Sequence, residues 1–367
     1  MGTGSSSPSK LEQDLGYTEP VEAGERYYGL ENFGNTCYCN SVMQALYFCG
    51  PLRTELLARH TQNSSATVMA TGSSQYPAGS LLYQLAELFA VITNTKRLSG
   101  RVAPQAFMQT LRETNELFRG NMQQDAHEFY NFIINDMADT LLRMSADKSG
   151  DQAAPKTTWI HDLFQGVLTN ETKCICCETV THRDEPFVDL PLDIEQNCSV
   201  TACLRNFSRM ETLTGCNKFF CETCCALQEA EKRMCLRRLP RVLTLHLKRF
   251  KYMEQIQNFS KLSHRVVFPL ELRMPNMARD SAADADGILY HLFAVVVHIG
   301  RGLNHGHYVA VVKSQGRWML FDDDLVEVVD EAVLHKVFGL SNHLGGSTNT
   351  GYLLFYDCGE RSAASAP

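Results

Sequence analysis

A cysteine near the start of the chain has the surroundings of a nucleophile. Cys37 follows a Gly/Asn-rich turn and opens a segment in which apolar residues recur at helical spacing. Asn35 and Thr36, just before it, are residue types that cap helices. A thiol at a helix N-terminus lies by unpaired N–H groups and the positive end of the helix dipole, which favour the nucleophilic thiolate. The apolar residues expected to face a core on this amphipathic helix are Val42, Ala45, Leu46 and Cys49.

A histidine and three acidic residues near the other end support a catalytic Cys37, which alone would fit a small buried apolar residue equally well. His307 ends a Gly-rich loop and begins a β-type run over residues 308–312, and residues 318–321 read as the next strand. Asp322, Asp323 and Asp324 stand at the end of that strand. A thiolate needs an imidazole to take and return its proton, and the imidazole needs a carboxylate or amide to orient it. Two adjacent strands would present His307 and Asp322 side by side.

Five sequence blocks together resemble the ubiquitin-specific proteases, a family of cysteine deubiquitinases. They are GLENFGNTCYCNS, QQDAHEF, NHGHYVAVV, WMLFDDD and GYLLFY, in the family order, and the resemblance covers roughly residues 28–357. The short length and the blocks FQGVLTNETKC, LHLKRFKYM and KLSHRVVFPLELR are most similar to the small subgroup activated by WD-repeat β-propeller proteins. The resemblance therefore implies hydrolysis of the isopeptide bond between the ubiquitin C-terminal glycine and a substrate lysine, with a WD-repeat activator and no catalytic cofactor.

The resemblance also assigns catalytic roles. Cys37 would be the nucleophile, His307 the general base and acid, and Asp322 the residue that orients the imidazole. Asp323 matches a neighbour that helps to polarise the site in some members, so the division of work between the two aspartates stays open. Asn32 would donate its side-chain amide to the oxyanion beside the Cys37 backbone N–H. Taken alone, Asn32 is a turn former, and the two interpretations are compatible.

Four residues are expected to receive the C-terminal tail of ubiquitin. Acidic family residues at the positions of Asp125 and Glu128 line that channel, next to Gln124, and the basic tail would form charge-assisted hydrogen bonds with them. Without the resemblance, these residues read as the solvated first turn of a helix. Tyr308 would wall the narrow part of the channel, where only glycine fits.

Two CxxC pairs predict a metal site. Cys174 and Cys177, with Cys221 and Cys224, supply four thiolates for a closed, structural Zn²⁺ site. A thioredoxin-like redox pair is the rival interpretation, but no βαβ pattern surrounds either CxxC, and the resemblance also favours zinc. Neighbouring Cys176 and Cys225 could each replace a ligand. The remaining cysteines of this region are expected to be packing or solvent-facing thiols, namely Cys198, Cys203, Cys216 and Cys235.

Bulk properties fit an intracellular protein. The 367 residues carry a net charge of −7 without a Lys/Arg-rich block, so nucleic acid is not an expected partner. No apolar run is long enough to span a bilayer and no signal-peptide pattern opens the chain. Fourteen cysteines then argue for a reducing compartment, cytoplasmic or nuclear. Residues 1–24 read as a flexible tail in which Gly2 and Ser6 match an N-myristoylation pattern, although a chance match in a Ser-rich tail explains it too.

The elements predict an α+β fold of the papain-like cysteine protease kind. Helices are expected at residues 81–92, 107–118 and 125–144, polar loops at 61–80 and 145–157, and a strand-rich region from Phe164. The resemblance divides residues 25–357 into a helical thumb (25–163), zinc-bearing β fingers (164–240) and a β-rich palm (241–357), with a tail at 358–367. Loops at 251–265 and 300–306 would flank the channel as mobile segments.

Three other functions would use the same residues differently. A catalytically silent ubiquitin-binding scaffold would not need an intact Cys37, His307 and Asp322. A protease for another ubiquitin-like modifier would share them. A plain zinc-binding adaptor would explain the four cysteines but neither catalytic block.

Overall fold

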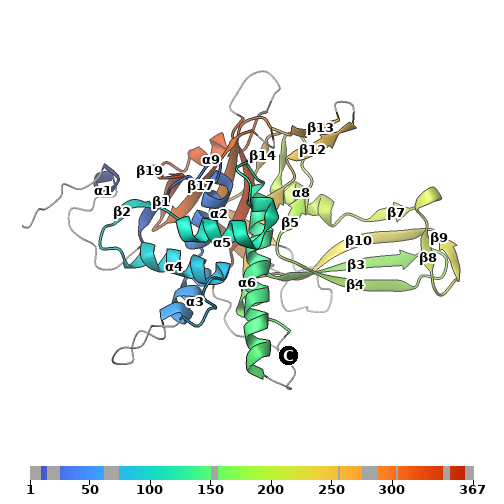
Figure 1. Ribbon diagram of the computed structural model, residues 1–367. Helices are drawn as coiled ribbons and strands as arrows, with labels where there is room; N and C mark the ends of the chain where they lie inside the picture. The colour runs from blue at the N-terminus through green and yellow to red at the C-terminus, as the bar shows by residue number, and fades with distance from the viewer. Residues whose placement is uncertain are drawn as a thin grey trace, which may run out of the picture.

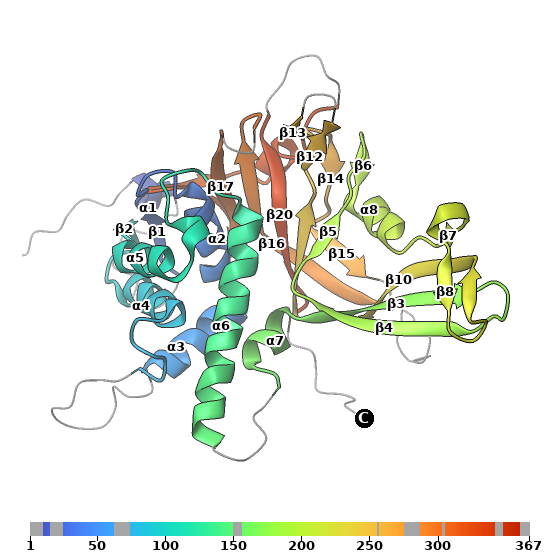
Figure 2. The ribbon, with the colours of Figure 1, turned by 45° about the vertical axis from the view of Figure 1, so that its right-hand side comes forward.

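The structure is a computed structural model that describes residues 10–14, 25–61, 74–149, 156–254, 257–274, 287–302, 305–341 and 348–359. Gly2, with the myristoylation pattern, and the last eight residues lie outside the described residues. Figures 1 and 2 show three parts: helices on one side, a large sheet in the centre, and a long β ribbon that projects from the other side. None of the helices in the described part combines the length and apolarity needed to cross a bilayer.

The helical part follows a short strand, β1 (Tyr27–Leu30), which pairs in parallel with β2 (Ser99–Val102). Its helices are α2 (Cys37–Tyr47), α3 (Gly50–Thr61), α4 (Leu81–Asn94), α5 (Gln105–Thr114), the 3-10 turn η1 (Glu116–Phe118), α6 (Ala126–Ser149) and α7 (Trp159–Phe164). The predicted stripe on α4 is buried, from Leu81 to Ile92. The predicted loop from 145 was wrong at its start, because α6 continues to Ser149.

The central sheet has the strand order β19-β18-β17-β16-β20-β11-β5, with β15 also paired to β16. Its strands are β5 (Leu190–Leu192), β11 (Val242–Leu247), β15 (Glu271–Met274), β16 (Ile288–Ile299), β17 (His307–Ser314), β18 (Arg317–Asp322), β19 (Leu325–Val329) and β20 (Thr350–Asp357). The long apolar runs of β16 and β20 are buried on both faces, because α2 packs on one face and a second apolar cluster fills the other.

The projecting ribbon is a four-stranded sheet in the order β4-β3-β10-β7. Its members are β3 (Gly166–Cys174), β4 (Val180–Phe187), β7 (Glu211–Leu213) and β10 (Ala230–Arg238), and a small hairpin, β8 (Phe219–Cys221) with β9 (Ala226–Gln228), lies at its far end (Figure 2). Helix α8 (Val200–Phe207) interrupts the predicted strand-rich region and packs against β5 and β6 (Cys198–Ser199). Strand β6 pairs in parallel with β14 (Val266–Val267).

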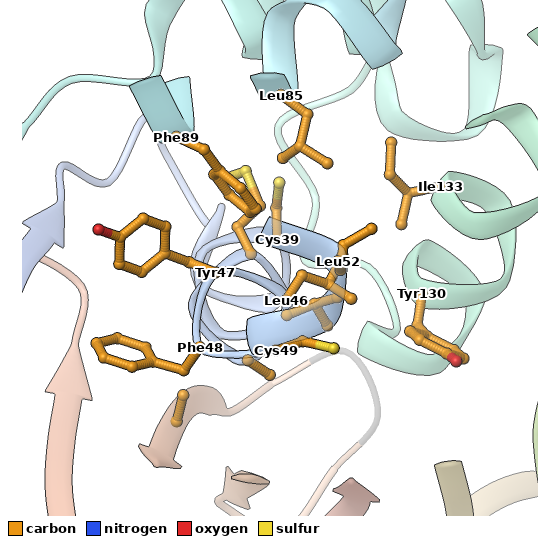
Figure 3. Close-up of a cluster of buried hydrophobic side chains, with 14 of the residues drawn as sticks. Cys39, Leu46, Tyr47, Phe48, Cys49, Leu52, Leu85, Phe89, Tyr130 and Ile133 are labelled. Atoms are coloured by element: carbon orange, nitrogen blue, oxygen red, sulfur yellow. The ribbon is translucent and has the colours of Figure 1, made fainter. Parts of the chain in front are cut away.

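Helix α2 lies at the centre of the molecule rather than on its surface. The predicted core positions Val42, Ala45, Leu46 and Cys49 are buried as expected, but every residue of α2 is buried, so the polar face of an amphipathic helix is not exposed. The reason is that α2 contacts α3 and α6 on one side and β16, β17 and β18 on the other. Figure 3 shows the apolar part of this packing: Tyr47 lies beside Phe89 of α4, with ring centroids 5.1 Å apart, and Leu46 and Ile133 of α6 belong to the same apolar cluster.

Two segments expected to lack regular structure contain it. Within the predicted N-terminal tail, α1 (Lys10–Asp14) contacts β19, and its Leu11 joins the core. Within the predicted loop at 251–265, β12 (Phe250–Met253) and β13 (Asn258–Lys261) form a hairpin with exposed aromatic side chains on Tyr252 and Phe259. Polar residues dominate both segments, and single apolar anchors such as Leu11 leave no periodic pattern. The remaining short helix is α9 (Val333–Lys336).

Candidate active site

The turn before Cys37 places the thiol at the start of α2. Gly34 and Asn35 both adopt positive φ, 83° and 56°, which is the left-handed region that glycine and asparagine tolerate best. Thr36 is the N-cap residue, but its hydroxyl accepts a hydrogen bond from Phe33 N, outside the helix, and makes no cap to α2. The first turn of α2 thus keeps N–H groups without a side-chain cap, next to the buried Cys37.

His307 lies between Cys37 and Asp322. Strands β17 and β18 are antiparallel neighbours, so His307, at the start of β17, meets Asp322, at the end of β18. The His307 Nε2 to Asp322 Oδ1 distance is 2.5 Å. The hydrogen bond with Cys37, followed by the one with Asp322, raises the pKa of His307 to about 9 against the opposing effect of burial. The imidazole is therefore held in its protonated form near neutral pH, which is the partner a thiolate needs.

Asp323 points to a different set of partners. One carboxylate oxygen accepts from Asn32 Nδ2 at 2.7 Å and the other from Asn40 Nδ2 at 2.8 Å. The backbone carbonyl of Asp323 accepts from Leu30 N at 2.8 Å. Asp323 therefore ties the turn after β18 to the segment that leads into α2. Sequence reasoning missed Asn40, whose only signal was a polar side chain one helical turn after Cys37.

Gln123 is a second residue that sequence reasoning missed. Its side chain is buried, and its amide Nε2 donates toward Cys37 Sγ at 3.9 Å. Its Oε1 accepts from Gly306 N at 2.9 Å, directly before His307. One side chain thus contacts the thiol and the loop that carries the imidazole. An uncharged glutamine gives no titratable signal, and only its place as the first residue of QQDAHEF could have found it.

Gly306 is required by close packing. A Cβ on Gly306 would lie 2.4 Å from His298 Nε2 and 2.5 Å from the Ile299 carbonyl oxygen. The backbone of this residue therefore approaches β16 more closely than any side chain allows, and this approach positions the Gly306 N–H for Gln123. The Gly-rich composition predicted a mobile loop here, but close packing explains the glycine at position 306.

Three of the four predicted tail-binding residues lie along one cleft of about 310 Å³. Gln124, Asp125 and Glu128 line it together with Gln123, His127 and His246. Gln124 and Asp125 were expected in the first turn of a helix, on one face with Glu128, but they precede α6, which begins at Ala126. Asp125 caps this helix through His127 N at 2.6 Å and also accepts from Tyr352 OH at 2.5 Å, so both of its carboxylate oxygens are engaged.

Glu128 and Tyr308 differ in how they meet this cleft. Glu128 is exposed, and partial burial followed by the nearby charge of Asp125 raises its pKa. Tyr308 is 1% exposed and packs its ring against His298 and Tyr352. Tyr308 therefore lies beneath the surface next to His307, and Glu128 offers the freer carboxylate.

The two CxxC pairs meet at the far end of the β ribbon. The sulfurs of Cys174, Cys177, Cys221 and Cys224 all lie within 4.8 Å of one another, and Cys177 and Cys221 are 3.5 Å apart. Hydrogen bonds with Thr179 lower the pKa of Cys177 to about 6. Cys176 and Cys225 are exposed and lie outside this cluster. The cluster is thus the set of four that the spacing predicted.

Comparison with known proteins gives one consistent result. The family described as "Ubiquitin carboxyl-terminal hydrolase" matches residues 28–356. "Ubiquitin carboxyl-terminal hydrolase 4" of Arabidopsis thaliana is 49% identical, over 95% of this chain and 97% of the relative. "Ubiquitin carboxyl-terminal hydrolase 12" of Salmo salar is 47% identical, over 95% of this chain and 94% of the relative.

A solved structure shares the fold. The "Structure of the SAGA Ubp8/Sgf11/Sus1/Sgf73 DUB module bound to ubiquitin aldehyde" superposes with a TM-score of 0.72 at 25% identity. The superposition covers 94% of this chain and 72% of the solved chain. The helical part, the central sheet and the β ribbon are therefore a known combination.

Proposed function

This chain belongs to the ubiquitin carboxyl-terminal hydrolase family and is a cysteine-type deubiquitinase, and we propose that Cys37, His307 and Asp322 carry out its hydrolysis. The observation that supports this assignment best is the position of His307, which hydrogen-bonds Cys37 on one side and Asp322 on the other. The same order of nucleophile, base and orienting carboxylate activates thiols and hydroxyls on unrelated folds.

The reaction proceeds by two acyl transfers. His307 takes the Cys37 proton, and the thiolate attacks the carbonyl carbon of the terminal glycine of ubiquitin. The isopeptide C–N bond then breaks, the His307 imidazolium protonates the leaving lysine amine, and a thioester remains on Cys37. Water attacks the thioester with His307 as the base, which releases the ubiquitin carboxylate and restores the thiol.

Asn32 and the Cys37 backbone N–H form the oxyanion hole in this proposal. Asn32 Nδ2 gives one hydrogen to Asp323, which leaves its second N–H for the oxyanion, while Asn32 Oδ1 accepts from Thr36 N at 3.2 Å. An amide fixed at both ends is already oriented when charge develops. Asp323 thus acts on Asn32, and Asp322 acts on the imidazole. Gln123 is a positioning residue, because it contacts both the thiol and the loop before His307.

The cleft beside Gln123 receives the ubiquitin tail. Glu128 supplies the carboxylate for a basic tail residue, and Gln124 supplies a polar wall. Tyr308, buried next to His307, supports the narrow part near the imidazole from beneath. Asp125 contributes by holding the start of α6, with its negative charge next to the same cleft. The related solved structure holds ubiquitin aldehyde, which supports ubiquitin as the modifier.

We also propose that the four-cysteine cluster holds one structural Zn²⁺. Tetrahedral zinc with bonds of about 2.3 Å separates its sulfurs by about 3.8 Å, and the spacing within the cluster fits this value. Bound zinc would lock the end of the β ribbon and perform no catalytic step. Residues 25–163 would then act as a thumb, 164–240 as fingers that grip ubiquitin, and 241–357 as a palm.

A WD-repeat β-propeller protein is the proposed activator, because the blocks LHLKRFKYM and KLSHRVVFPLELR resemble the subgroup that such proteins activate. Labelling with ubiquitin that carries a C-terminal electrophile tests both proposals. We expect an adduct with the wild type and none with Cys37→Ala, and faster labelling with the partner present. Cys39→Ala, also buried on α2, is the matched control that should still react.

Each other outcome favours a rival function. Ubiquitin binding without an adduct in any condition would favour a silent scaffold. No ubiquitin binding, with labelling by another modifier that ends in Gly-Gly, would favour a different substrate. An adduct that forms equally fast without a WD-repeat protein would refute the activation proposal but leave the enzyme assignment intact.

A further inference from the structure

Two cysteines outside the active site and the four-cysteine cluster lie in contact. Cys198, in β6, and Cys203, in α8, have their sulfurs 3.5 Å apart. Both are free thiols, and neither is among the residues that the proposed mechanism or the proposed zinc site uses. Sequence spacing gave no reason to pair them, and they were expected to be unrelated packing or surface thiols.

The fold fixes the backbone at both positions. Ser199 is the N-cap residue of α8, and its hydroxyl accepts from Ala202 N at 3.2 Å. Cys198 therefore precedes the cap and Cys203 is the fourth helical residue, the two positions whose side chains pack together across a helix start. The backbone of Cys198 is also held from outside, because its N–H donates to Arg265 O at 3.1 Å and β6 pairs with β14. The two sulfurs are thus held near each other before any reaction.

The distance and the surroundings suit a covalent bond. A disulfide needs sulfurs about 2.0 Å apart, so these two must approach by roughly 1.5 Å, a movement that side-chain rotation can supply. Arg249, fully buried nearby, interacts electrostatically with both sulfurs.

The two cysteines differ in their access to an oxidant. Cys198 is half-buried, whereas Cys203 is 3% exposed. Burial, and then the neighbouring Cys198, raise the pKa of Cys203 to about 12. Cys198 is therefore the thiol that an oxidant in solution reaches first, and the buried Cys203 is positioned to react second.

We propose that Cys198 and Cys203 are a peroxide-responsive pair that forms an intramolecular disulfide. Hydrogen peroxide transfers one oxygen to Cys198, which gives a sulfenic acid and one water. The Cys203 sulfur then attacks the Cys198 sulfur, the S–O bond breaks, and a second water leaves as the disulfide forms. Two thiols are oxidised, one peroxide is reduced, and two waters are produced. The product joins the start of α8 to β6 covalently.

The chain offers a direct readout, because one tryptic peptide, residues 184–205, contains both cysteines and no other. The full-length protein is treated with hydrogen peroxide, denatured in the presence of iodoacetamide and digested with trypsin. The mass of this peptide is then measured. We expect a form that lacks both alkyl groups, weighs two hydrogens less than the reduced peptide, and becomes doubly alkylated after treatment with a thiol reductant. The readout is a mass and does not depend on the proposed catalytic roles.

Two controls make the result decisive. In Cys198→Ser the peptide should carry one alkyl group on Cys203 at the same peroxide dose, and unfolding wild type in urea before oxidation should reduce the disulfide form severalfold. Cys216→Ser, which replaces an exposed cysteine in another tryptic peptide, should leave the disulfide yield unchanged. The proposal is wrong if Cys198 gains oxygen while Cys203 remains fully alkylated, or if the folded and unfolded proteins give the same yield.

Discussion

Replacing Gln123 by leucine tests whether this side chain positions the reacting groups. The change removes the hydrogen bond from Gly306 N (2.9 Å) and the weaker one to Cys37 Sγ (3.9 Å). Little packing is lost, because leucine has a similar volume. A neutral hydrogen bond contributes about 0.5–1.5 kcal/mol. One full and one weak bond give about 1–2 kcal/mol, which is roughly a 5- to 30-fold loss in kcat/KM if both serve the transition state.

The assay is cleavage of ubiquitin fused to a fluorogenic leaving group, with ubiquitin affinity and thermal stability measured in parallel. A positioning role predicts a loss in kcat with little change in KM, since the Gln123 bonds hold the enzyme's own groups. Gln109→Leu on the exposed side of α5 is the matched control and should retain wild-type kcat/KM. If Gln123→Leu stays within about twofold of wild type with unchanged stability, the positioning argument is wrong.

A glutamate at position 123 separates the two hydrogen bonds. Gln123→Glu keeps an acceptor for Gly306 N but replaces the donor to Cys37 Sγ with a carboxylate. A negative charge there disfavours the thiolate, so alkylation of Cys37 by iodoacetamide should require higher pH than in wild type. A purely structural Gln123 would leave that pH profile where it is.

Four further changes have defined outcomes. The alkaline limb of the pH–rate profile is set by the His307 imidazolium, whose pKa is about 9. Asp322→Asn should lower kcat and move this limb to lower pH, whereas Asp323→Asn should lower kcat without moving it. Equal shifts in both variants would contradict the division between the two aspartates. Gly306→Ala should lose activity and about 1–3 kcal/mol of stability by overpacking, seen in urea unfolding; a wild-type midpoint would refute the close approach. Zinc removal by a chelator should destabilise the β ribbon and release one metal per chain, measured with a colorimetric dye; a metal-free wild type with the same stability would exclude zinc. Burial lowers the pKa of His298 to about 3, so below about pH 6.5 the unfolded chain binds more protons than the folded one. The free energy of unfolding should therefore fall by roughly 2 kcal/mol between pH 7.5 and 5. An equal fall in His298→Phe would assign the change to other groups.

The α+β fold and the family were predictable because chemically distinctive residues define them. A helix-start cysteine, a Gly-His-Tyr strand and two CxxC pairs are rare combinations, and their types and order carry the information. The structure places Cys37 next to His307 and gathers the four predicted cysteines. Comparison confirms the family and its mixed fold. The roles of the individual residues stay predictions until the variants above are measured.

Residues that act through hydrogen bonds were harder to find. Gln123 and Asn40 have neutral amides, which are common in turns and helices and have no spacing rule. Asp125 was predicted to line the ubiquitin-tail channel, and in the cleft its oxygens also accept hydrogen bonds from His127 N, at the start of α6, and from Tyr352 OH. A carboxylate before a helix fits either role, and only the direction of its oxygens separates them. Sequence periodicity also could not predict that α2 is buried on all sides. Its polar residues form hydrogen bonds within the chain: Gln44, for example, donates to Tyr28 O at 2.7 Å.

Asp322 and Asp323, at the end of β18, explain how two halves of the chain become one site. Asp322 ends a strand and faces His307 on the neighbouring strand. Asp323 follows with φ of 50°, a left-handed turn, and its two carboxylate oxygens accept hydrogen bonds from Asn32 and Asn40. Consecutive residues of one turn therefore hold the base and the segment that carries the nucleophile. An exchange of the two roles would require the turn to change its handedness, so a substitution disfavouring positive φ, Asp323→Val, should disturb both contacts and cost more activity than Asp323→Asn, which tolerates that φ.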